Sequence, residues 1–129
     1  MRRFVFWTGM ISLSVGLGLQ FQGLAAHLMP SAEPGMLLRL CGLMVVFVGI
    51  TLILCSRDLK QRGTLVLWEG LLRLGVSVVM GGYGLFGEGG LQLATAGLGD
   101  LIIAVAYFVW LPRHLHVSFM DLLLDRHAA

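Results

Sequence analysis

Residues 65–87 read LVLWEGLLRLGVSVVMGGYGLFG, an apolar run in which Glu69 and Arg73 are the charged members. A helix of this length spans roughly 34 Å, and the hydrocarbon core of a bilayer is about 30 Å thick. The run therefore predicts a membrane-spanning helix. Because charged side chains that face lipid are costly, the same run predicts that this helix packs against other helices.

Three further apolar runs of similar length occupy most of the remaining chain, at residues 4–25, 35–55 and 91–111. None shows the alternation of period two that is typical of barrel strands. Prolines or glycines lie in two of the connections between runs, and a short charged segment forms the third. We predict an all-α polytopic membrane protein: a four-transmembrane-helix bundle over residues 1–111 and a cytoplasmic tail at 112–129 with a short amphipathic helix.

The composition agrees with this class. Hydrophobic residues make up 57% of the chain and charged residues 12%, against about 25% charge in soluble domains. The net charge is +2, and the basic residues are spread over several segments instead of forming one stripe. This distribution argues against a nucleic-acid partner.

The first run has a second interpretation. Arginines at positions 2 and 3, an apolar run and the sequence Gly-Leu-Ala at 23–25 are also features of a cleaved signal peptide. The run is longer than the usual apolar core of such a peptide. It also carries small and polar residues at intervals of four, which predict a retained helix with a packing face: Thr8, Ser12, Gly16 and Gln20.

The orientation follows from the basic residues. Seven of the nine lysines and arginines flank the spans on one side, and the other two, Arg39 and Arg73, lie within spans. We therefore expect a multi-pass protein of the bacterial inner membrane with both termini in the cytoplasm. Tryptophans favour the interface between membrane and water, and three of them are expected to anchor the inner one: Trp7, Trp68 and Trp110.

The charged residues within the spans predict a cluster. Glu69 and Arg73 are four residues apart and share a helix face, and Asp100 in the fourth run is expected at a similar depth. One guanidinium is able to contact both carboxylates, with Ala96, Gly97 and Ala104 allowing close helix approach. Two hypotheses remain open: a proton or ligand site, or an ion cluster that fixes helix register.

Arg39 is a separate case, because it is expected near the outer surface. It is able to reach the headgroups or to meet Glu33 or Glu88. On its own helix it begins a stripe that we expect to pack inward: Arg39, Gly42, Val46 and Gly49.

The tail is amphipathic. One predicted face is apolar and is expected to lie on the membrane surface or against a partner: Leu115, Phe119, Leu122 and Leu123. A frayed end is the alternative. The histidines fall outside the predicted spans, and no catalytic or metal-binding motif occurs, so we predict no catalytic residue, no metal site and no cofactor.

Short motifs at Arg39-Leu-Cys-Gly, Arg73-Leu-Gly and Gly99-Asp100 resemble the DoxX-like group of small four-helix bacterial membrane proteins, over roughly residues 36–113. The resemblance implies a four-helix bundle, and some relatives are linked to quinone or thiol redox systems. It implies no catalytic residue here.

Three functional hypotheses follow. The first is a non-enzymatic accessory, assembly or structural subunit of a membrane complex, whose partners are the lipid bilayer and other membrane subunits or further copies of the chain. The second is a small oligomeric transporter or channel that uses Glu69, Arg73 and Asp100. The third, suggested by the resemblance alone, is a quinone-linked redox protein.

Overall fold

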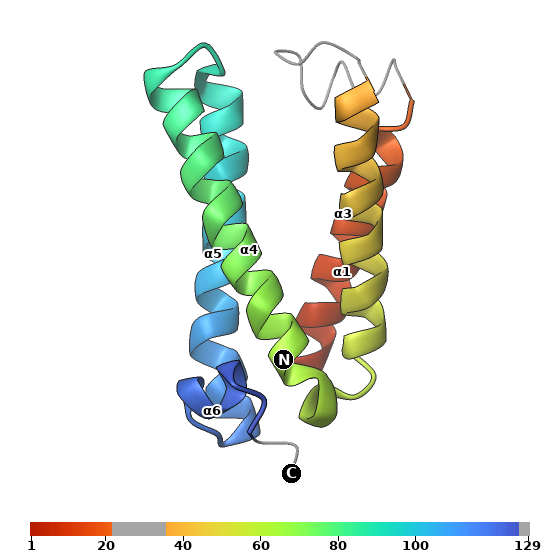
Figure 1. Cartoon of the computed structure of the whole chain (residues 1–129), viewed down its shortest axis with the longest axis vertical. Coiled ribbons are helices and arrows are strands. Elements are labelled where there is room, and N and C mark those ends of the chain that lie inside the picture. Colours follow the sequence, from red (N-terminus) through yellow and green to blue (C-terminus); the bar gives the residue numbers. More distant parts are fainter. Residues whose placement is uncertain (22–35, 127–129) are drawn as a thin grey trace. The chain divides into compact units, whose positions relative to one another are not determined.

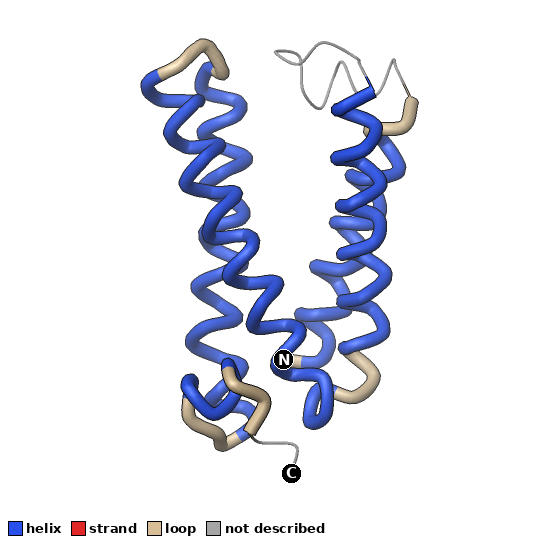
Figure 2. Tube along the Cα trace, in the orientation of Figure 1, coloured by secondary structure: helices blue, strands red, loops and turns tan. Residues whose placement is uncertain are grey.

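The computed structural model describes residues 1–21 and 36–126, and every regular element in these ranges is a helix (Figures 1 and 2). Three of the helices are long and apolar enough to cross a membrane. The all-α class is therefore confirmed for the described residues. The elements are α1 (Arg2–Gly18), α3 (Met36–Cys55), α4 (Leu59–Phe86), α5 (Gly90–Leu115) and α6 (Phe119–Leu123).

The first helix is shorter than the predicted run of 4–25. α1 has 17 residues, about 25 Å, and residues 22–25 lie outside the described ranges. After Gly18, the amides of Gln20 and Phe21 donate to carbonyls three residues back, which tightens the last turn. Gly16 and Gly18 also have low helix propensity. The described residues thus contain three candidate spans and not four.

The chain divides into two compact units, and the first contains α1 and α3, which run side by side (Figure 1). Glycines bring the two backbones together. A Cβ atom on Gly16 would lie 2.7 Å from the carbonyl oxygen of Gly42, and one on Gly49 would lie 2.8 Å from that of Gly9. The hydrogen that replaces each side chain therefore points at a carbonyl oxygen, a geometry that suits weak Cα–H···O contacts.

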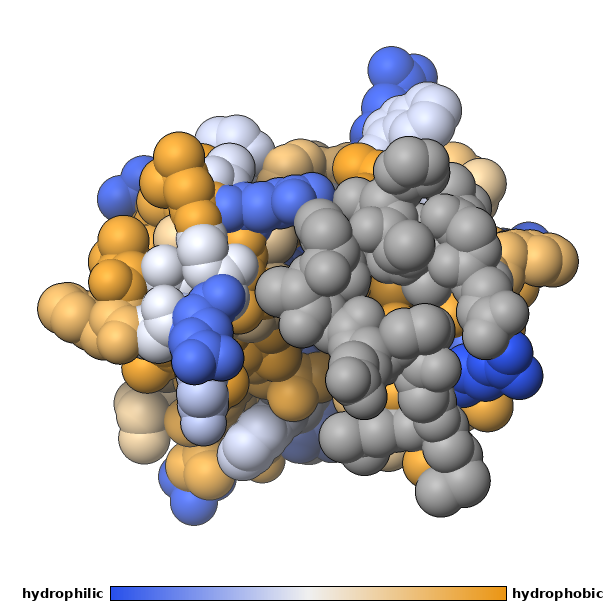
Figure 3. All heavy atoms as spheres, turned by 90° about the horizontal axis from the view of Figure 1, so that it is seen from above, coloured by the Kyte–Doolittle hydropathy of each residue, from blue (hydrophilic) through white to orange (hydrophobic). Residues whose placement is uncertain are grey.

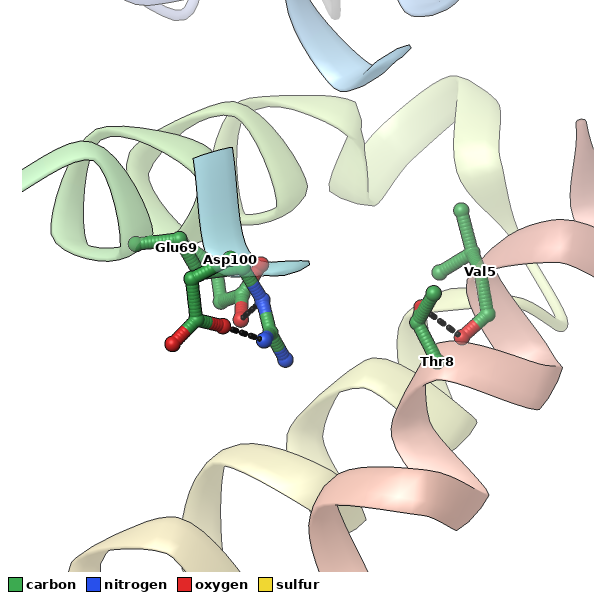
Figure 4. A network of polar contacts seen from close by, with 5 residues as sticks. Val5, Thr8, Glu69 and Asp100 are labelled. Atoms are coloured by element: carbon green, nitrogen blue, oxygen red, sulfur yellow. Dashed lines mark hydrogen bonds and ion pairs between the residues drawn. The ribbon is translucent and has the colours of Figure 1, made fainter. Parts of the chain in front are cut away.

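The small-residue stripes predicted for these helices form this interface, except that Arg39, expected to pack inward, is exposed. Thr8, Ser12 and Gly16 are buried on α1, and Gly42 and Gly49 are buried on α3. The hydroxyl of Thr8 donates to the carbonyl of Val5 within the same helix at 2.9 Å (Figure 4). The packing face expected for the first run is confirmed at its three buried members.

The second unit contains α4, α5 and α6. α4 and α5 form an antiparallel hairpin through residues 87–89 (Figure 1). Near this turn the backbones approach closely, because a Cβ on Gly84 would lie 2.5 Å from the amide nitrogen of Ala94. Further along, Gly70 leaves room for the aromatic rings of Tyr107 and Phe108.

Both helices of the hairpin extend beyond their predicted bounds. α4 begins at Leu59, six residues before the predicted start, because the Asp58 side chain caps it by accepting from the amide of Gln61. α5 continues through Pro112 to Leu115. Proline removes one backbone N–H donor from a helix. Here only the short last turn of α5 follows Pro112. The predicted boundary at residue 111 lies inside α5.

Large apolar side chains cover the outer surface of the helices. Seen from above, hydrophobic residues lie on the outer surface (Figure 3). Phe47 and Phe86 are 70% and 91% exposed. Several hydroxyls donate to their own helix, such as that of Ser77 to the carbonyl of Leu74 at 2.8 Å. Apolar surface of this extent, with polar groups satisfied internally, suits lipid better than water.

Candidate functional site

The charged residues predicted to cluster do meet in the α4–α5 hairpin (Figure 4). Arg73 Nε lies 2.5 Å from Glu69 Oε1 on the same helix, and Arg73 Nη1 lies 2.5 Å from Asp100 Oδ1 on α5. The pair within α4 has the spacing of one helical turn. The pair between helices fixes the register of α4 against α5. We call Glu69, Arg73 and Asp100 the ionic triad.

The ionic triad is largely shielded from solvent. The side chains of Glu69, Arg73 and Asp100 are 9%, 13% and 23% exposed. Oε2 of Glu69 is buried and has no hydrogen-bond partner among the described residues. Two carboxylates thus face one guanidinium. The less exposed of the two, that of Glu69, has an oxygen without a hydrogen-bond partner among the described residues. A site of this kind is able to bind one further positive charge.

Small residues on α5 bring the triad together, as expected, but not all of the predicted ones do so. Gly97 and Ala104 are buried, and a Cβ on Gly97 would lie 3.1 Å from the carbonyl of Ser77. Ala96 is exposed, so its predicted part in this close approach is wrong. The buried positions of α5 recur at residues 97, 104 and 111, and Ala96 lies beside this stripe.

Arg39 lies on α3, in the first unit. Its side chain is exposed, while its carbonyl accepts a hydrogen bond from Gln20 Nε2 at 3.0 Å. This bond joins the turn after α1 to α3, so Gln20 contacts α3 from beyond the end of α1. Glu33, one expected partner of Arg39, lies outside the described residues.

The three tryptophans expected at the interface are all exposed, with Trp7 at 62% and Trp68 and Trp110 at 54%. Their placement at a membrane surface stays a prediction. Trp68 has an additional contact that the sequence did not indicate: its Nε1 donates to the carbonyl of Leu123 at 3.2 Å. This tryptophan therefore binds the tail of its own chain.

The apolar residues of the tail are partly covered by α4 and α5. Leu122 is fully buried, Leu115 and Leu123 are half-buried, and Phe119 is 37% exposed. The Phe119 ring meets Phe108 edge-on, with 5.8 Å between centroids. At Leu122, the surface predicted for a membrane or a partner is thus occupied by the chain's own helices.

Polar residues on α4 and α6 hold the tail in place. Thr64 Oγ1 lies 2.8 Å from both the Leu122 carbonyl and Asp125 Oδ1. Ser118 caps α6 by accepting from the amide of Asp121. The cap could have been read from the sequence Ser-x-x-Asp at 118–121. Thr64 carries no local signal for a contact with a segment 58 residues away.

No group of three or more His, Cys, Asp and Glu residues in the described ranges lies close enough to hold a metal ion. One shallow apolar groove lies along the C-terminal part of α4 and its cap residue, lined by Val78, Val79, Gly82, Tyr83, Phe86 and Gly87. Its lining comes from a single helix, so it is a surface feature that suits another helix better than a small polar ligand.

Comparison with known protein families, curated proteins and solved structures gives no match. The resemblance to the DoxX-like group therefore stays a prediction that rests on three short motifs. Of their residues, Gly42 packs against α1, while Gly75 and Gly99 face open space.

Proposed function

We propose that this chain is a multi-pass protein of the bacterial inner membrane that serves as an accessory or assembly subunit of a larger membrane complex. The observation that carries the proposal is a glycine face of α4 that is left open within its own unit. A Cβ on Gly75 or Gly82 would meet nothing within 4 Å, and Gly82 lies in the apolar groove. In lipid, helices associate through close packing at small residues.

The spacing supports a helix as the occupant. Gly75 and Gly82 are seven residues apart, as are Gly42 and Gly49, which pack directly on α1. The same spacing thus makes a helix interface in one unit and stands open in the other. We propose that a transmembrane helix of a partner subunit fills the groove on α4.

Gentle solubilisation of the tagged chain tests this role. Native mass measurement is expected to show the chain together with other membrane proteins. Gly82→Leu fills the groove and is expected to abolish this association. Gly99→Leu is the matched control, because Gly99 also faces open space but lies on α5, outside the groove. Recovery of the wild-type chain as a lone monomer would contradict the proposal, and self-association alone would identify a homo-oligomer.

The proposed orientation has its own test. Cysteines introduced at Lys60 and Glu88, with the exposed Cys41 replaced by serine, are to be labelled in intact cells with an impermeant reagent. Both termini in the cytoplasm require that position 88 reacts and position 60 does not. The reverse pattern would invert the topology.

A second candidate function is a small carrier or channel, favoured by the unpartnered oxygen of Glu69 in the triad. Such a role requires several copies, because one chain encloses little space. Flux across proteoliposomes that is lost in Asp100→Asn would favour it, and flux that is unchanged in this variant would exclude the triad from the path.

A further inference from the structure

The charges of the ionic triad do not balance. With every group ionised, two carboxylates and one guanidinium leave one negative charge in a site whose side chains are 9–23% exposed. A buried charge without a partner is strongly unfavourable, and groups in such positions neutralise. The site therefore needs one more positive charge.

The contacts indicate which atom receives it. Asp100 is the more exposed acid, and its Oδ1 already contacts Arg73 Nη1. Glu69 is the less exposed acid, and its Oε2 has no hydrogen-bond partner among the described residues. Oε2 is thus a buried acceptor with an unused position.

Apart from Arg73, the basic side chains between residues 57 and 126 are all exposed and lie outside the ionic triad: Arg57, Lys60, Arg62, Arg113, His114, His116 and Arg126. On α5, the buried Tyr107 interacts electrostatically with Arg73, but a phenol adds no positive charge. Asp121 on α6 and Asp125 after its end are acidic and exposed. Among the described residues, the cation in contact with Glu69 is Arg73, which Asp100 shares.

We propose that the ionic triad binds one proton at neutral pH and that Oε2 of Glu69 carries it. The proton comes from the aqueous phase and forms an O–H bond on Glu69. The triad then contains one carboxylic acid, one carboxylate and one guanidinium, and its net charge is zero. This assignment concerns the charge state of the site and holds whether the chain is an accessory subunit or a carrier.

Infrared spectroscopy of the full chain in lipid nanodiscs reads the proton directly. A glutamate in water is protonated in about one molecule in 500 at pH 7, so a carboxylic-acid C=O band at this pH is diagnostic. The band is expected to shift when glutamates carry ¹³C in their side-chain carboxyl groups and to stay when aspartates do. The absence of a band at pH 7, or a shift with labelled aspartate, would overturn the proposal.

Variants then locate the proton. Glu69→Gln is expected to remove the band, whereas Glu88→Gln, at an exposed position in the turn, is expected to keep it. A band that persists in Glu69→Gln would contradict the proposal. The isotope result on the wild-type chain stands even where a variant fails to fold.

Discussion

The two helix pairs of this chain are held together by different means. α1 and α3 meet through glycines, with the Cβ positions of Gly16 and Gly49 occupied by backbone atoms of the facing helix. α4 and α5 also approach closely near their turn, but their contact centres on the ion pair between Arg73 and Asp100. The first interface is specified by shape, and the second by shape and charge.

This difference helps to distinguish residues needed for helix packing from residues that have another role. Glycine contacts are sufficient to pair two apolar helices, as α1 and α3 show, so the α4–α5 hairpin does not need charged residues merely to associate. Glu69 is the clearest case, because it lies on the same helix as Arg73 and does not bridge the helices. We therefore propose a role beyond packing for the ionic triad.

The largest effect is expected from Arg73→Gln. The substitution leaves the acids Glu69 and Asp100 without the cation that contacts both, which should lower the free energy of unfolding by about 3–5 kcal/mol. Denaturant titration of the chain in mild detergent measures this loss. Arg57→Gln, at an exposed position, is the control and should change the free energy of unfolding by less than about 0.5 kcal/mol.

The fully neutral variant sharpens this result. Glu69→Leu, Arg73→Met and Asp100→Leu combined should recover most of the stability, because replacing a whole buried ion cluster by apolar residues of similar volume is often close to neutral. A triple variant as unstable as Arg73→Gln alone would show that the charges themselves hold the hairpin together.

The next effect concerns the glycine interface. Gly16→Ala places a methyl group against the backbone of Val46 and Gly42, and overpacking of this kind costs about 1–3 kcal/mol. The same titration measures it, with Gly99→Ala as the control in open space. Equal stability of the two variants would contradict the close approach of α1 and α3.

A smaller effect is expected at the docked tail. Trp68→Phe keeps an aromatic ring but removes the donor to the Leu123 carbonyl, with a cost of about 1 kcal/mol. Hydrogen exchange at residues 117–126 should become faster. Trp7→Phe, in the other unit, should leave this segment unchanged, and unchanged exchange in Trp68→Phe would show that the bond does not hold the tail.

The smallest effect is expected for Gly75→Ala. Because a Cβ at this position meets nothing within 4 Å, the substitution should raise the free energy of unfolding of the isolated chain by about 0.5–1 kcal/mol through helix propensity. A loss of stability in the isolated chain would show that Gly75 is packed after all.

The sequence was sufficient to predict the features that depend on local pattern. Apolar runs long enough to cross a membrane predicted α3, α4 and α5. A spacing of four residues predicted the contact between Glu69 and Arg73. The rise per residue of a helix predicted that Asp100 lies at a depth similar to that of Arg73. These inferences need no knowledge of tertiary contacts.

The features that sequence reasoning missed depend on contacts between distant residues. The tail is held by Thr64 and Trp68, which lie more than 50 residues earlier in the chain. α1 ends near the hydrogen bond between Gln20 and the Arg39 carbonyl, and no local sequence pattern predicts that hydrogen bond. Whether Ala96 or Gly97 lies at the interface depends on how α5 is rotated by one residue. A stripe of small residues in the sequence does not determine that rotation.

The short turn between α4 and α5 has a consequence for biogenesis. With only residues 87–89 between them, the two helices are able to enter the bilayer together as a helical hairpin. A lone arginine or aspartate at the centre of an inserting helix costs about 2.5–3.5 kcal/mol at the translocon. Arg73 and Asp100 arriving as a preformed pair would share that penalty, so lengthening this turn should slow membrane integration more than it weakens the folded protein.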